Sequence, residues 1–130
     1  MRQVFWRALK QKHQILLNKY ADEVTGIFCC NETTTEGMLL ALKQQGLAGK
    51  VKFVGFDSNE ALLNGMNAGE VHALAVQSPY KMGYLAVKAA KDSLDGKTVE
   101  RVIDTGVTLV TPENKDTEII QEILNPELVK

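Results

Sequence analysis

Short apolar runs alternate with longer helix-like segments along this chain, and that alternation limits its fold more than any other feature. Three runs of strand length are each followed by a polar turn and then by a segment with helical periodicity; the runs span residues 26–30, 51–56 and 71–76. Strands that alternate with helices of about 10–15 residues are typical of βαβ units, whose strands pair in parallel. The pattern predicts an α/β fold in which right-handed crossovers place helices on both faces of a parallel sheet.

Capping residues, proline and glycine mark the expected helix boundaries. Thr33 and Glu36 have the spacing of a capping box, which predicts that a helix begins there. Ser78 followed by Pro79 predicts another helix start, since proline is favoured at the first helical position. The three helices are expected to end at glycines, namely Gly46, Gly69 and Gly96. Three further elements are predicted: a first helix over 4–20, an extended stretch over 102–110 and a short helix around 119–124.

Length and composition are those of a single globular domain. The chain has 130 residues, 24% of them charged, and a formal net charge of -1. That balance offers no basic surface for a nucleic-acid partner. No apolar run approaches the roughly 20 residues that a membrane-spanning helix needs. The adjacent Cys29 and Cys30 form no zinc-type pattern with histidine, so neither a metal nor a cofactor is expected, and both are interpreted as small buried thiols.

Each of the three predicted strands ends in a polar side chain: Asn31, Asp57 and Gln77. In a parallel sheet these ends share one edge, and open α/β sheets bind ligands at that edge where the strand order reverses. Two amides and a carboxylate there would suit a polyhydroxylated ligand, because each hydroxyl both donates and accepts hydrogen bonds. The alternative is that Asn31 and Asp57 only cap helices. Gln77 favours a site, since glutamine is a poor cap and stands beside Ser78, which caps well.

Four segments resemble the type I periplasmic sugar-binding proteins: 26–32, 50–57, 75–83 and 103–114. The resemblance runs from about residue 9 to residue 128, and the most similar subgroup is the ribose-type binding proteins of ABC importers. In that subgroup an Asn, an Asp and a Gln at the positions of Asn31, Asp57 and Gln77 bond the sugar hydroxyls. The resemblance also implies an aromatic residue that stacks on the sugar ring, and Phe5 or Trp6 falls near its position.

A whole protein of this family has two lobes, so the resemblance implies that this chain is part of the carboxy-terminal lobe and that the amino-terminal lobe is missing. Residues 1–113 would form the incomplete sugar-binding lobe, and 114–130 a tail with a helix. Helix 79–95 would belong to the crossover toward the missing lobe. Its apolar stripe is therefore expected to dock back on its own sheet or to pair with a second chain, for example by domain swapping; the stripe comprises Met82, Leu85, Ala86 and Ala89.

The function implied by this resemblance is that of the solute receptor of an ABC importer. Two lobes would close on a ribose-like monosaccharide outside the cytoplasm, and a membrane permease would read the closed form, with no bond made or broken. The alternative is the effector-binding core of a sugar-responsive LacI-type transcriptional regulator. A phosphoacceptor receiver domain is disfavoured, because the acidic pair and the lysine it needs are absent. An enzyme is disfavoured because His13 and His72 have no nucleophile or carboxylate partner by spacing.

Overall fold

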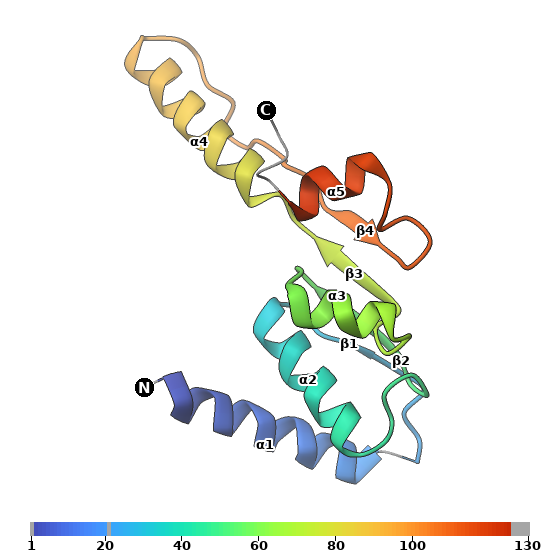
Figure 1. The fold of residues 1–130 in the computed structure, drawn as a ribbon. Coiled ribbons are helices and arrows are strands. Elements are labelled where there is room, and N and C mark those ends of the chain that lie inside the picture. Colours follow the sequence, from blue (N-terminus) through green and yellow to red (C-terminus); the bar gives the residue numbers. More distant parts are fainter. Residues whose placement is uncertain (1, 21, 126–130) are drawn as a thin grey trace.

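The computed structural model describes the backbone of residues 2–20 and 22–125, and the side chains of those residues from 11 onward. Helices and strands alternate along the chain (Figure 1). The elements in order are α1 (Arg2–Tyr20), β1 (Gly26–Phe28), α2 (Glu32–Gln44), β2 (Lys52–Phe56), α3 (Glu60–Asn67), β3 (Ala73–Val76), α4 (Pro79–Leu94), β4 (Thr108–Val110) and α5 (Glu118–Leu124). Within these ranges, no helix is both long enough and apolar enough to span a bilayer.

The strands pair into one sheet in the order β1-β2-β3-β4. Strands β1, β2 and β3 run parallel, with Phe28 opposite Val54 and Phe56 opposite Ala75. The predicted α/β class and the parallel pairing of these strands are therefore confirmed. The fourth strand differs from the prediction in two ways: it is antiparallel to β3, and it occupies only the end of the extended stretch expected over 102–110.

Helices cover one face of this sheet. Phe53 and Leu74 on that face are fully buried, whereas Phe28 and Leu109 on the opposite face are 60% and 55% exposed. Helices were expected on both faces, and strand order explains the difference. Each step from β1 to β2 to β3 moves in the same direction across the sheet, so right-handed crossovers put α2 and α3 on the same side. For the same reason the strand order of the described residues contains no reversal, contrary to the expectation for the site.

A single apolar core lies between the helices and the covered face of the sheet. Phe53 from β2, Leu42 from α2 and Leu62 from α3 are fully buried within it. Val110 and Ile120 attach β4 and α5 to the same core. Burial of each large side chain contributes about 1.5–3 kcal/mol, so this core accounts for the position of α5 beside the sheet.

The helix ends follow local signals with one exception. Asn59 caps α3 and Ser78 caps α4, with side-chain oxygens accepting from Leu62 N–H at 2.9 Å and Lys81 N–H at 3.3 Å. The capping box at Thr33 and Glu36 is wrong, because α2 begins earlier and Asn31 is its cap. The glycine stops are confirmed in backbone geometry, with positive φ just past each helix at Gly46, Gly69 and Gly96.

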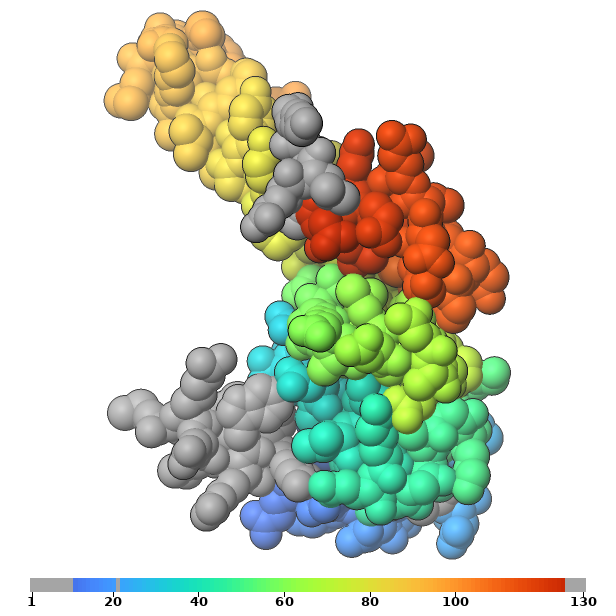
Figure 2. Space-filling view, viewed as in Figure 1, coloured from blue at the N-terminus to red at the C-terminus, as the bar shows by residue number. Residues whose placement is uncertain are grey.

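Helix α4 projects away from the sheet, as Figures 1 and 2 show. None of its residues is buried, and Tyr84, Val87 and Leu94 are more than half exposed. The expectation that this helix docks back on its own sheet is therefore wrong. Pairing with a second chain stays a prediction, and sedimentation over a range of concentrations would test it.

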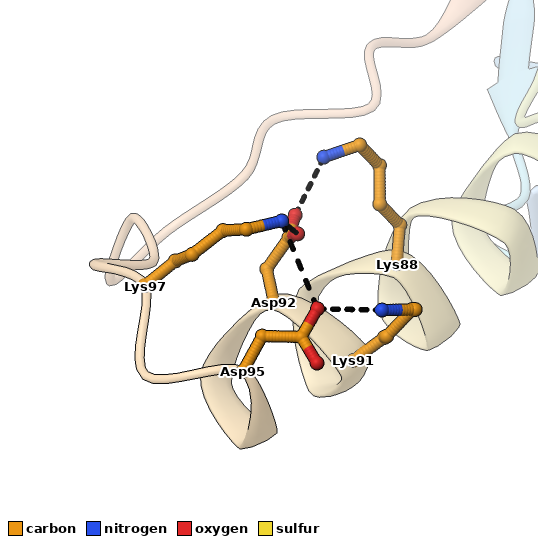
Figure 3. A network of polar contacts seen from close by, with 5 residues as sticks. All are labelled: Lys88, Lys91, Asp92, Asp95 and Lys97. Carbon is orange, nitrogen blue, oxygen red and sulfur yellow. Dashed lines mark hydrogen bonds and ion pairs between the residues drawn. The ribbon is translucent and has the colours of Figure 1, made fainter.

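Charged side chains tie the end of α4 to the turn that follows it (Figure 3). Lys88 pairs with Asp92 at 2.6 Å and Lys91 with Asp95 at 2.5 Å, each one helical turn apart. Lys97 reaches back to Asp92 at 2.7 Å. These pairs are exposed to solvent, so their contribution is expected to be small and to fall with added salt.

Candidate functional site

The three polar residues that follow β1, β2 and β3 lie at the same edge of the sheet. The register of β1 with β2 ends at Phe28 opposite Val54, and Asn31 follows three residues later as the cap of α2. The pairing of Phe56 with Ala75 puts Gln77 one residue farther along than Asp57. Parallel pairing therefore brings the ends of the three strands to one edge, where Asp57 and Gln77 line the same cavity.

Asp57 and Gln77 line one open cavity of about 200 Å³ at this edge. The other lining residues come from the start of α2, the loop after β2, the end of β3, the start of α4 and the end of α5; they are Glu32, Ser58, Val76, Pro79, Ile123 and Leu124. Asn31 does not line the cavity but immediately precedes Glu32, which does. Ligand pockets commonly measure about 300–1,000 Å³, so this open cavity is smaller than a typical ligand pocket.

Asn31 caps α2 and keeps donor groups available. Its Oδ1 accepts from Thr34 N–H at 2.9 Å and from the Thr34 hydroxyl at 3.0 Å. Asn31 therefore does cap a helix, which was the alternative considered from its sequence position. Within the described residues, its Nδ2 group makes no hydrogen bond, so two N–H donors remain free for a ligand.

Asp57 does not cap a helix, because Asn59 caps α3. Its backbone has a φ of 60°, in the left-handed region that most side chains avoid. Such a position costs about 1–2 kcal/mol, although Asp and Asn tolerate it better than other residues. The carboxylate is thus held at the cavity by a turn that has an energetic cost, as is common where a side chain must serve a function.

Gln77 is half-buried and leaves the capping of α4 to Ser78. Its side-chain amide combines an oxygen acceptor with two N–H donors. Together with the carboxylate of Asp57, it offers a ligand both donors and acceptors inside one cavity. This donor and acceptor set matches hydroxyl groups, each of which can donate one hydrogen bond and accept two.

Two polar residues of the cavity, Glu32 and Ser58, were absent from the sequence prediction. Glu32 follows the cap residue of α2, and its Oε1 accepts from Asn59 Nδ2 at 2.8 Å. Ser58 follows Asp57 in the same turn. Proximity in sequence to a predicted site residue was the available signal for both. The apolar pair Ile123 and Leu124 had no such signal, since α5 reaches the cavity only through tertiary packing.

The aromatic residues predicted to stack on a sugar remain untested. Phe5 and Trp6 lie within α1, but their side chains fall outside the described part of the molecule.

A larger cavity of about 390 Å³ lies between α1 and β1 and is mostly apolar. His13 and Cys29 line it and are buried, whereas Cys30, which also lines it, is exposed, so the prediction of two buried thiols holds only for Cys29. Burial raises the pKa of the Cys29 thiol to about 11 and lowers the pKa of His13. The described residues contain no metal-binding cluster of His, Cys, Asp or Glu. The apolar lining suits hydroxyl groups less well than the strand-end cavity does.

Residues 7–98 match the family described as Periplasmic binding protein domain. The D-ribose/D-allose-binding protein of Pseudomonas aeruginosa is 32% identical over 100 residues, covering 74% of this chain and 31% of that protein. The fructose import binding protein of Bifidobacterium longum is 36% identical over 90 residues, covering 68% of this chain and 27% of that protein. This chain thus spans less than a third of the length of either relative.

A solved structure supports the same relationship. An ABC transporter solute binding protein from Agrobacterium vitis with bound D-fucose superposes with a TM-score of 0.85 at 37% identity. The superposition covers 92% of this chain and 41% of that one. The described fold therefore corresponds to a part of that solute-binding protein.

Proposed function

This chain belongs to the periplasmic binding protein family, and we propose that it binds a monosaccharide at the shared edge of β1, β2 and β3. The family consists of substrate-binding proteins rather than enzymes. The observation that carries the proposal is that Asp57 and Gln77 line one cavity, which Glu32, the residue directly after Asn31, also lines. The names of similar proteins include ribose, allose, fructose and fucose, which supports a monosaccharide as the ligand.

Each residue has a distinct role in the proposal. The Asp57 carboxylate accepts hydrogen bonds from two neighbouring hydroxyls, and such charge-assisted bonds are the stronger ones. Gln77 both donates and accepts, whereas Asn31 only donates, because its oxygen already caps α2. Phe5 and Trp6 remain candidates for stacking on the ring. The proposal assigns these side chains hydrogen bonds and stacking only, so the sugar is bound and released unchanged.

The small open cavity favours a binding site of which this chain supplies only one side. In the proposal, residues 1–113 form part of the carboxy-terminal lobe, α4 leads toward an amino-terminal lobe, and 114–130 form the tail. Closure of two lobes would bury the sugar, and a permease of an ABC importer would read the closed form outside the cytoplasm. Because this chain supplies only one of the two lobes, it is expected to bind sugar much more weakly on its own than a closed two-lobed protein does. The import proteins among the relatives favour transport over the regulator alternative.

Titration of the isotope-labelled chain with D-ribose, D-allose, D-fructose and D-fucose tests the proposal. At least one sugar should shift the amide resonances of residues 31, 57 and 77 in a saturable way. Asp57→Asn should weaken that binding about tenfold or more and keep the fold, because Asn tolerates the left-handed backbone and removes only the charge. The exposed Asp116→Asn variant is the matched control. Shifts confined to the cavity between α1 and β1 would contradict the proposal.

A further inference from the structure

We propose that Thr35 is a positioning residue whose buried hydroxyl holds the start of α2 against the end of β2 and thereby fixes Asn31 relative to Asp57. This inference rests on the proposed function, because the relative placement of Asn31 and Asp57 affects binding only if both contact one ligand. Thr35 lies in the first turn of α2, does not line the strand-end cavity, and is fully buried.

One hydroxyl joins two segments that are far apart in the sequence. Thr35 Oγ1 donates to the carbonyl oxygen of Asn31 at 2.7 Å and accepts from the backbone N–H of Phe56 at 3.0 Å. A hydroxyl has one proton and two lone pairs, so it can make both bonds at once. Its separation from the Phe56 carbonyl oxygen is longer, at 3.4 Å. The hydroxyl thus connects the Asn31 backbone with the residue directly before Asp57.

The bond to Phe56 replaces a strand–strand bond at the point where the chain leaves the sheet. Just past the carboxyl end of β1, the N–H of Cys29 donates a hydrogen bond to the carbonyl oxygen of Val54 in β2, at 3.1 Å. Beyond it the chain turns into α2, and the N–H of Phe56 finds its acceptor in Thr35 instead. A buried N–H without an acceptor is costly, so this hydroxyl stabilises the place where β2 ends and the left-handed turn at Asp57 begins.

Gly55 sets the direction of the hydroxyl. A Cβ atom at position 55 would lie 2.1 Å from Thr35 Cγ2 and 3.0 Å from Leu74 Cδ2. The Thr35 methyl group therefore packs directly on the Gly55 backbone. Because threonine is branched at Cβ, fixing its methyl group also fixes its Oγ1. The bonds to Asn31 and Phe56 therefore have a defined geometry rather than that of a freely rotating hydroxyl.

A second link between the same segments lies nearer the surface. Asn59 Nδ2 donates to Glu32 Oε1 at 2.8 Å and to Glu36 Oε2 at 3.2 Å, which joins α2 to the cap of α3. Water competes for these partly exposed groups more than for the buried Thr35 hydroxyl. Loss of that hydroxyl should therefore loosen the site while the Asn59 contacts and the apolar core keep α2 in place.

Three variants of the full chain test the inference. Thr35→Val removes the hydroxyl and keeps the shape, Thr35→Ser keeps the hydroxyl, and Thr33→Val makes the same change two residues earlier on α2. In Thr35→Val, the affinity for whichever of D-ribose, D-allose, D-fructose and D-fucose binds the wild type should fall about tenfold, and the Phe56 amide should exchange its hydrogen faster. Thr35→Ser keeps the hydroxyl but lacks the methyl group that packs on Gly55, so it should restore most of both properties, and Thr33→Val should leave both unchanged. If Thr35→Val does not fold, Thr35→Ser and Thr35→Ala give the same comparison, since they differ by one oxygen atom.

The outcomes separate this inference from the proposed function. Wild-type affinity in Thr35→Val would overturn the positioning role and leave sugar binding intact. Equal loss of affinity in Thr35→Val and Thr35→Ser would also overturn it, because the hydroxyl would then not be responsible. If the wild type binds none of the four sugars, the proposed function fails for them. In that case the residual dipolar couplings of the Asn31 and Asp57 amides, which report the relative orientation of these two groups, test the positioning role. A change in the couplings of Thr35→Val that is absent in Thr35→Ser supports positioning. Unchanged couplings in Thr35→Val overturn it.

Discussion

The backbone N–H of Asp57 donates to the carbonyl oxygen of Ala75 at 2.8 Å, one residue beyond the end of β2. This bond keeps Asp57 paired with β3 at the residue where its own backbone turns to a φ of 60°. The acid therefore lines the same cavity as Gln77, two residues after Ala75. A side chain proposed to bind ligand thus stands at a backbone position that costs stability.

Replacement of Asp57 should separate stability from binding. Asp57→Gly should have a free energy of unfolding about 1 kcal/mol higher than Asp57→Ala, because glycine adopts the left-handed region without a Cβ clash. Both variants lack the carboxylate and should lose sugar binding equally. Urea denaturation gives the comparison. If the alanine variant proves as stable as the glycine variant, the left-handed turn is not present in solution.

The contact between Gly55 and Thr35 predicts a marked asymmetry between two glycine substitutions. Gly55→Ala should lower the free energy of unfolding by about 1–3 kcal/mol, because its Cβ would overlap Thr35 Cγ2. Gly83→Ala is the matched control: its Cβ meets no atom within 4 Å, and alanine is favoured over glycine in a helix by about 1 kcal/mol. Equal denaturation midpoints for Gly55→Ala and Gly83→Ala would contradict the packing described for Gly55.

The adjacent cysteines should react at very different rates. Cys30 is exposed, whereas Cys29 is buried and its pKa is raised to about 11 by burial. Brief treatment with iodoacetamide near pH 8 should therefore modify Cys30 and leave Cys29 intact, because the thiolate is the reactive form. Mass spectrometry of the digested chain reads out both positions. Cys30→Ser should abolish the fast reaction, and rapid modification of Cys29 in that variant would show that it is accessible.

Acid should loosen the end of α4 in a way that depends on Asp92. Its hydrogen bonds with Lys88 and then Lys97 lower the pKa of Asp92, so the folded state holds the ionised form more strongly than the unfolded chain does. The contribution is therefore present above the unfolded value of about 3.9 and is lost as the pH falls through the lower folded pKa. Carbon chemical shifts of residues 88–97 during a pH titration measure this. In Asp92→Asn the acid transition of these residues should disappear, and its persistence would assign the transition to another group.

Local signals account for the parts of the fold that the sequence predicted well. Ser78 caps α4 through an N–H three residues later, as its position before Pro79 predicted, and the apolar runs became β1, β2 and β3. The same kind of reasoning misplaced the start of α2. Thr33 and Glu36 have capping spacing, but Asn31 already satisfies the Thr34 N–H, and Glu36 instead accepts a hydrogen bond from Asn59.

Sequence patterns were sufficient to predict the α/β class and the three polar residues after the strands, because strand alternation and capping act over only a few neighbouring residues. Tertiary structure alone decided that the helices gather on one face, that Asp57 and Gln77 share a cavity, and that α4 stands apart from the sheet. It also decided the contact of Thr35 with Gly55 and Phe56. These features depend on register, on the direction of each crossover and on packing between residues about 20 positions apart, which no local pattern encodes.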